Sequence, residues 1–386
     1  MIDTVVITFD KDQFEILEPD IFSPSARMME VSPNRIGRNG CIRCFQNPSK
    51  EDLARGIYRP RFTLTKRLTR GGYTQNLRAE FSLPKLFFGN NFEEDGLKNT
   101  TGHNAFFANE ALATGIKILP FQVTSAKLSA IHYSKNFIFT DFTTSSMILR
   151  QLSRLNLNSR LDLNKTDYRN GGHALRYHAN SYEIVFYDKV KDLKQSRISE
   201  RRAIESDNLI QADLLSNLPK PFEVLRMEVR LNSRAKIKRL CHKLGIKPPL
   251  TFEEALNRKT SQTILLHFWN QIMSEAKWLQ FEKQRPEDLL QAILKANPDI
   301  RPSKALQILG AISVASSVGT RGLKAILGDK TSRTLDRLKF KAIKVGMSCP
   351  KSLYFTGIYE QLIDFKPLRL PINIKNRGGN NKCNMQ

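Results

Sequence analysis

The sequence is poor in cysteine. Five cysteines stand among 386 residues, and only Cys41 and Cys44 form a CxxC pair. No second pair follows at the spacing of a zinc ribbon, and two ligands do not complete a tetrahedral structural zinc site. We therefore expect unpaired thiols in a reducing compartment, and neither a disulfide framework nor a zinc module.

Long apolar runs are also missing. No stretch reaches the roughly 20 apolar residues of a transmembrane helix, and no strongly amphipathic basic helix stands out. The opening, MIDTVVITFDKD, has no basic segment before its apolar run, so it predicts a first strand and not a signal peptide. We expect no membrane partner.

Acidic residues are scarce relative to basic ones. The chain has 61 Lys and Arg against 37 Asp and Glu, a formal net charge of +24, while 40% of its residues are hydrophobic. That hydrophobic content is typical of a globular protein, and the length allows two or three domains. The excess of positive charge predicts a polyanionic partner, and without a membrane segment nucleic acid is the better candidate.

The pattern of the chain changes near residue 247. Before it, short alternating runs such as TVVITF, YEIVFY and FEVLRMEVRL predict strands separated by Gly, Asn and Pro clusters. After it, Thr251 and Glu254 have the spacing of a capping box, and helical patterns follow. We predict an α+β domain over 1–247 with a mainly antiparallel central sheet and flanking helices, a helical DNA-binding or accessory region over 248–372, and a disordered tail over 373–386.

One predicted strand, SYEIVFYDKVKDL at residues 181–193, carries a tyrosine on its polar side. Side chains alternate between the two faces of a strand, so Tyr182 shares a face with Ile184, whereas Tyr187 shares a face with Lys189. The first face is typical of a core. A tyrosine on a polar face is more often a packing residue, but it can also be a nucleophile.

Three further side chains stand on separate predicted strands and could bind a divalent cation: Glu80, His132 and Glu228. Carboxylate and imidazole ligands with open positions suit Mg²⁺ or Mn²⁺, which polarises a phosphodiester. Each also has an ordinary structural interpretation. Glu228 lies between Arg226 and Arg230, as in a cross-strand row of salt bridges, and a single histidine is more often a hydrogen-bonded structural residue.

The segments GNNFEE, IHYSKN, YEIVFYDKVKDL and LRMEVRL together resemble the rolling-circle replication initiators of the filamentous-phage gene II type and related phage and plasmid replication proteins. The opening MIDTVVITF fits that family as well. The resemblance runs from residue 1 to roughly residue 280 and fades beyond it. It implies an endonuclease fold of the rolling-circle replication type.

The activity that the resemblance implies is metal-dependent nicking and rejoining of one DNA strand at a replication origin, through a 5′-phosphotyrosine. Carried over to this sequence, Tyr187 is the nucleophile, Lys189 assists it, and Glu80, His132 and Glu228 hold Mg²⁺ or Mn²⁺. The implied partners are supercoiled and single-stranded origin DNA and a host helicase and DNA polymerase, in the cytoplasm of a bacterial cell.

The sequence departs from the wider superfamily in one respect, because it contains no His-hydrophobic-His pair. His173 and His178 are separated by an odd number of residues, which places them on opposite sides of a strand. Two other functions stay open: a mobilisation relaxase with the same chemistry, and a non-catalytic origin-binding protein or repressor.

Candidate DNA contacts concentrate in three places. The asparagines after Gly89 could form a turn or contact DNA. Eight Lys and Arg lie between residues 226 and 247, and a helix-turn-helix pattern spans 319–347. The predicted DNA-binding residues are Asn90, Asn91, Lys135, Arg226, Arg230, Arg234, Lys236, Arg333, Arg337 and Lys341.

Overall fold

The structure is a computed structural model of the 386-residue chain. It describes residues 1–30, 41–49, 51–52, 57–70, 72–96, 100–140, 143–157, 161, 163, 165–169, 172–196, 223–276, 285–328 and 353–368.

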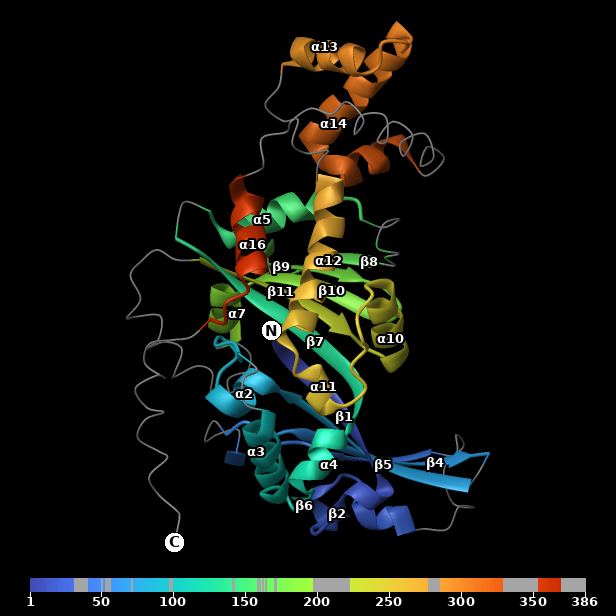
Figure 1. Ribbon diagram of the computed structural model, residues 1–386, viewed down its shortest axis with the longest axis vertical. Coiled ribbons are helices and arrows are strands. Elements are labelled where there is room, and N and C mark those ends of the chain that lie inside the picture. The colour runs from blue at the N-terminus through green and yellow to red at the C-terminus, as the bar shows by residue number, and fades with distance from the viewer. Residues whose placement is uncertain are drawn as a thin grey trace.

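A nine-stranded antiparallel sheet organises the described part of the chain (Figure 1). In spatial order its strands are β3 (Cys41–Gln46), β4 (Arg61–Thr69), β5 (Gly72–Ser82), β1 (Ile2–Asp10), β7 (Lys127–Phe139), β11 (Glu223–Leu231), β10 (Tyr182–Asp188), β9 (Ala174–His178) and β8 (Lys165–Arg169). A small second sheet pairs β2 (Glu15–Ile16) with β6 (Ile116–Lys117). The α+β class with a large antiparallel sheet, predicted from the sequence, is confirmed.

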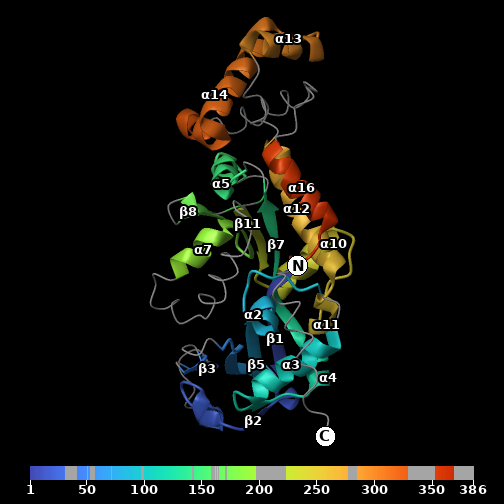
Figure 2. The same ribbon diagram turned by 90° about the vertical axis from the view of Figure 1, so that its left-hand side faces the viewer.

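The sheet has one apolar face because its strands alternate. In β11, Leu225, Met227, Val229 and Leu231 are fully buried in a single core cluster, as the alternation of this segment predicts. Helices cover this face, and Figure 2 shows several of them on one side of the strands. The helices that contribute to the cluster are α2 (Leu83–Phe88), α3 (Thr100–Leu112), α4 (Pro120–Ser125), α5 (Ser145–Ser153), α10 (Arg234–Lys243), α11 (Phe252–Ala255), α12 (Arg258–Ala276) and α16 (Leu353–Asp364).

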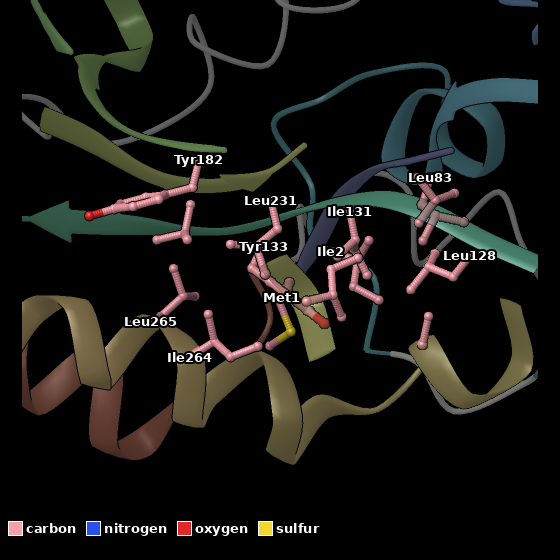
Figure 3. Packing of buried hydrophobic residues seen from close by; sticks show 14 of the residues in the cluster. Met1, Ile2, Leu83, Leu128, Ile131, Tyr133, Tyr182, Leu231, Ile264 and Leu265 are labelled. Atoms are coloured by element: carbon pink, nitrogen blue, oxygen red, sulfur yellow. The ribbon is translucent and has the colours of Figure 1, made fainter. Parts of the chain in front are cut away.

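The C-terminal helices do not form one unit. Ile264 and Leu265 of α12 pack beside Tyr133 and Leu231 of the sheet (Figure 3). The helices α13 (Pro286–Ala296) and α14 (Pro302–Leu327) instead share a small hydrophobic cluster of their own. Hydrophobic packing thus joins α11, α12 and α16 to the sheet, although the sequence pattern assigned them to a helical region beginning at residue 248.

On the side of β7 that faces β1, the last part of β7 has no neighbouring strand, although β11 pairs with its other side. The last paired residues are Ile2 and Tyr133, so β7 continues past the start of β1. Side chains from distant segments bond this edge: Glu94 accepts the amide proton of Asn136 at 2.6 Å, and Gln361 bonds both the N–H and the C=O of Ile138 at 2.9 Å. Because the edge is satisfied in this way, the loop after α2 is held against β7.

Short elements complete the fold. The 3₁₀ helices are Lys11–Gln13, Pro19–Ile21 and Ala26–Glu30, and α7 (Lys189–Ser196) follows β10 directly. Within the described residues, none of the helices combines the length and the apolar character that crossing a membrane requires.

Candidate functional site

The site lies on the side of the sheet opposite the core, which we call the polar face. Strand register places its side chains in rows: Tyr187, Arg226 and Asn136 are successive cross-strand partners on β10, β11 and β7. Tyr182 lies on the other side, buried against Phe268 with its hydroxyl donating to a backbone carbonyl. The predicted separation of the two tyrosines onto opposite faces is therefore confirmed.

Glu228 occupies the centre of the site. Its Oε1 accepts a hydrogen bond from the Tyr187 hydroxyl at 2.7 Å and one from Arg226 Nε at 2.9 Å. Its Oε2 accepts two more from Arg230, at 2.7 and 3.0 Å. The carboxylate is buried, and such charge-assisted bonds hold both of its oxygens in place.

Arg226 connects several segments of the protein by hydrogen bonds. Beyond Glu228, its two terminal nitrogens donate to Asp3 at 2.6 Å, Ser134 at 3.0 Å, and the Asn91 carbonyl and Asn136 side chain at 3.1 Å each. A guanidinium has five N–H groups, and every one has an acceptor here. Arg226 thus links three strands and a loop, and it has no N–H left over for a DNA phosphate.

Asp3 is a member of the site that the sequence did not indicate. Strict alternation would place it on the core side with Val5 and Ile7, which are buried there. The register between β1 and β7 shifts between Ile2 and Val5, however, and such a bulge re-aims a side chain. Asp3 therefore reaches Arg226 from the polar face.

The loop after α2 forms one wall of the site. Asn91 accepts the Arg226 bond through its backbone and a 2.7 Å bond from Lys189 Nζ through its side chain. The buried Lys189 ammonium lies 5.7 Å from the centre of the Tyr187 ring. Asn90 instead accepts the N–H groups of two following residues and is buried, so it shapes the turn, which was one of its two predicted roles.

The environment pushes the pKa values of Glu228 and Tyr187 in opposite directions. Arg230 and Arg226 lower the pKa of the Glu228 carboxyl far below its usual range and outweigh the effect of burial. Burial and the neighbouring Glu228 charge raise the pKa of the Tyr187 phenol well above its ordinary value. At neutral pH the pair is therefore a carboxylate that accepts a hydrogen bond from a neutral phenol.

Arg230 is the partly accessible cation of the site. Its side chain is 25% exposed and also approaches Glu183 at 3.6 Å, while Glu183 contacts His178 at 3.2 Å. His132 is the cross-strand partner of Arg230. Burial and the Arg230 charge lower the pKa of His132, so this imidazole is neutral at physiological pH.

The predicted metal ligands do not form a ligand set in this structure. Glu80 pairs with Arg78 at 3.1 Å, and three inter-strand spacings, or about 14 Å, separate its strand from that of Glu228. Both Glu228 oxygens already bond arginines. Among the described residues, no group of three His, Cys, Asp or Glu side chains is arranged to hold a metal ion. We therefore derive no step through a metal, and the requirement for Mg²⁺ or Mn²⁺ stays a prediction.

Several predicted DNA contacts lie away from the polar face. Lys135 is buried in a 2.7 Å ion pair with Glu94. Arg234 and Lys236 belong to α10, on the helix-covered side, where Lys236 lies 3.9 Å from the centre of the Tyr182 ring. Three predicted DNA-binding residues of the helix-turn-helix pattern, Arg333, Arg337 and Lys341, fall outside the described residues, as does the predicted tail.

The CxxC pair does not form a joint site. Cys41 and Cys44 both belong to β3, where Cys44 is buried and Cys41 is partly exposed. A separation of three residues directs the two thiols to opposite faces of the strand.

Comparisons of the chain with protein-family models, with curated proteins and with solved structures found no match.

Proposed function

We propose that this protein nicks and rejoins one strand of DNA at a replication origin, as an initiator of rolling-circle replication, with Tyr187 as the nucleophile. The observation that carries the proposal is the 2.7 Å hydrogen bond from Tyr187 to a carboxylate that two arginines hold, on the polar face of a strongly basic protein. Origin DNA is the substrate, a host polymerase extends the exposed 3′ end, and a host helicase separates the strands. The resemblance of the sequence to such initiators points the same way.

The geometry supports a separate role for each group. Attack of the Tyr187 oxygen on a phosphate forms a phosphotyrosine and breaks the P–O3′ bond, and the leaving 3′-oxygen takes a proton from solvent to become a 3′-hydroxyl. The phenol proton must leave during that attack, and Glu228 Oε1 is its hydrogen-bond acceptor. Arg226 keeps the carboxylate in position through contacts with three strands, so it is a positioning residue.

Arg230 couples substrate binding to this proton transfer. In the structure the transfer is unfavourable, because the two arginines make Glu228 a very weak base. A phosphate that binds the partly exposed Arg230 competes with Glu228 for its N–H groups. Release from one arginine raises the basicity of Glu228 at the moment when the nucleophile needs it.

The test is detection of a covalent DNA adduct on Tyr187. Wild-type protein is incubated with supercoiled DNA of its own replicon, and the adduct is located by peptide mapping. Tyr187→Phe should fold and bind DNA normally but form no adduct and no nick. Tyr182→Phe is the matched control, since it removes a hydroxyl from the same strand on the core side and should keep the activity.

An adduct that persists in Tyr187→Phe would remove this residue from the mechanism. Two observations favour a second candidate, a DNA-binding protein without catalysis: the Tyr187 phenol is held neutral, and every N–H group of Arg226 already has an acceptor. That candidate predicts tight origin binding by the wild type with no nick under any divalent-cation condition.

A further inference from the structure

Four arginines gather on the polar face at the end of the sheet farthest from β8. Arg43 lies on β3, Arg61 and Arg67 on β4, and Arg78 on β5, and all four are exposed. Register places Arg43 opposite Thr65 and Arg78 opposite Thr63, so the arginines share one face with threonine hydroxyls. Arg61 and Arg67 are six residues apart on one strand, which spreads the charge over about 20 Å.

Among the described residues, only Arg78 of this group is paired with an acidic side chain. Arg43, Arg61 and Arg67 form no side-chain hydrogen bond or ion pair within the described part of the chain. The two carboxylates on this part of the face are already paired, Glu80 with Arg78 and Asp10 with Lys127. The unpaired positive charge matches an extended polyanion.

An aromatic side chain stands among the arginines. Phe45 of β3 is 46% exposed and is the cross-strand partner of Thr63. It lies two residues from Arg43 on the same face and diagonal to Arg61 across the strand pair. Exposed rings beside arginines on a sheet stack bases of single strands, whereas a duplex keeps its bases inside.

The basic segment between residues 226 and 247 lies elsewhere. Lys238, Arg239 and Lys243 are exposed on α10, which packs through Ile237 and Leu240 on the helix-covered side of the sheet. The polar face and α10 are therefore on opposite sides, and one straight strand of DNA cannot contact both. The arginine group shares its face with Tyr187, and four to six inter-strand spacings, or about 19–29 Å, separate its three strands from the strand of Tyr187.

We infer that Arg43, Arg61, Arg67, Arg78 and Phe45, the β3–β5 patch, bind a single strand of DNA. The arginines contact phosphates, and the Phe45 ring stacks on a base. Under the proposed function, this strand is the one that continues from the nick site across the polar face. The binding site itself does not depend on Tyr187 chemistry.

The experiment compares two triple variants of the full chain that remove equal charge. One is Arg43→Gln, Arg61→Gln, Arg67→Gln on the patch, and the other is Lys238→Gln, Arg239→Gln, Lys243→Gln on α10. Fluorescence anisotropy with a labelled single-stranded oligonucleotide gives Kd at several salt concentrations. The patch variant should bind at least tenfold more weakly at 0.1 M salt (about 10 Å Debye length), and the slope of log K against log[salt] should fall by about 2, as expected for three lost phosphate contacts.

Phe45→Leu tests the stacking contact, because it keeps an apolar side chain but removes the ring. It should weaken single-strand binding roughly fivefold or more and leave duplex binding unchanged. An equal or larger loss in the α10 variant would overturn the assignment of the patch. Tighter binding of a duplex of the same length, with no effect of Phe45→Leu, would overturn the single-strand assignment. Either result leaves the Tyr187 adduct test unaffected, since that test reads covalent chemistry and not affinity.

Discussion

Glu228 accepts hydrogen bonds from three side chains while it is almost completely buried. A buried ion pair of this kind contributes little compared with an apolar replacement, but removing one partner leaves the other charge without compensation. Without the Glu228 charge, two guanidinium groups would lose the carboxylate that they share.

Glu228→Gln should therefore lower the free energy of unfolding by about 3–5 kcal/mol, in addition to any loss of nicking. Urea denaturation measures the change. Glu183→Gln is the control, because that side chain is a quarter exposed and pairs with Arg230 at 3.6 Å, so its loss should stay within about 1 kcal/mol. Equal, small effects of the two substitutions would show that the Glu228 ion pairs are dispensable for folding.

His132 should make the protein sensitive to mild acid. Its pKa is lower in the folded state than in the unfolded chain, because burial and Arg230 disfavour the imidazolium, although Glu228, Asp3 and Glu80 act in the opposite direction. The unfolded chain then binds more protons, so this contribution to stability is complete above about pH 6.5 and is lost as the pH falls below that value.

His132→Gln should remove this loss between about pH 7 and pH 5. The readout is the difference in urea midpoint between the variant and the wild type at each pH, since protonation of carboxylates such as Glu228 affects both proteins at still lower pH. A difference that does not change across this interval would contradict a depressed His132 pKa.

At the scale of elements, α14 is joined to α5 at a kink. Gly319 has φ +79°, and a Cβ there would lie 2.6 Å from the Arg154 carbonyl oxygen. Arg154 donates to the carbonyls of Ser316 and Ser317, and its own carbonyl accepts from Arg321. The glycine therefore permits both the turn of the chain and the close contact of two backbones.

Gly319→Ala should loosen this junction at a cost of about 1–3 kcal/mol. Hydrogen exchange of peptides covering residues 302–327 should become faster. Gly310→Ala lies in the same helix where a Cβ meets no atom within 4 Å, and it should slow exchange or leave it unchanged, since alanine favours a helix by up to about 1 kcal/mol. Similar exchange in the two variants would contradict the role of Gly319.

At the scale of the whole molecule, residues from before and after residue 250 pack together in one hydrophobic core. Phe252, Trp269 and Phe355 are buried in the same cluster as the strands, and Trp269 contacts both Phe186 and Phe355. Residues 1–250 by themselves would therefore leave the apolar face of the sheet exposed to water, which opposes their folding as a separate unit.

Truncation after residue 250 should give a protein without a cooperative unfolding transition. Replacing residues 285–328 with a short Gly/Ser linker should instead keep it, because α13 and α14 have their own cluster and α12 packs beside α16. Circular dichroism during urea unfolding distinguishes the two. A cooperative transition in the truncated protein would mean that residues 1–250 fold alone and that the boundary near 247 is a true domain boundary.

Much of this protein follows from local pattern. The alternation in FEVLRMEVRL and YEIVFY was enough to predict the strands, the buried face of β11 and the opposite positions of Tyr182 and Tyr187, because side-chain direction in a strand depends only on parity. The net charge of the protein follows directly from its composition. The α+β class followed from the alternating runs in the first part of the chain.

Other features were decided by tertiary structure, because they depend on contacts between segments far apart in the sequence. A bulge in β1 turns Asp3 toward Arg226, and only the strand order β1-β7-β11 brings those residues together. The same strand order gives every N–H group of Arg226 an acceptor within the protein. It also separates Glu80 from Glu228 by three strand spacings. Parity indicates which face a side chain takes, but the pairing of strands determines its neighbours, and pairing is set by the burial of the whole apolar face.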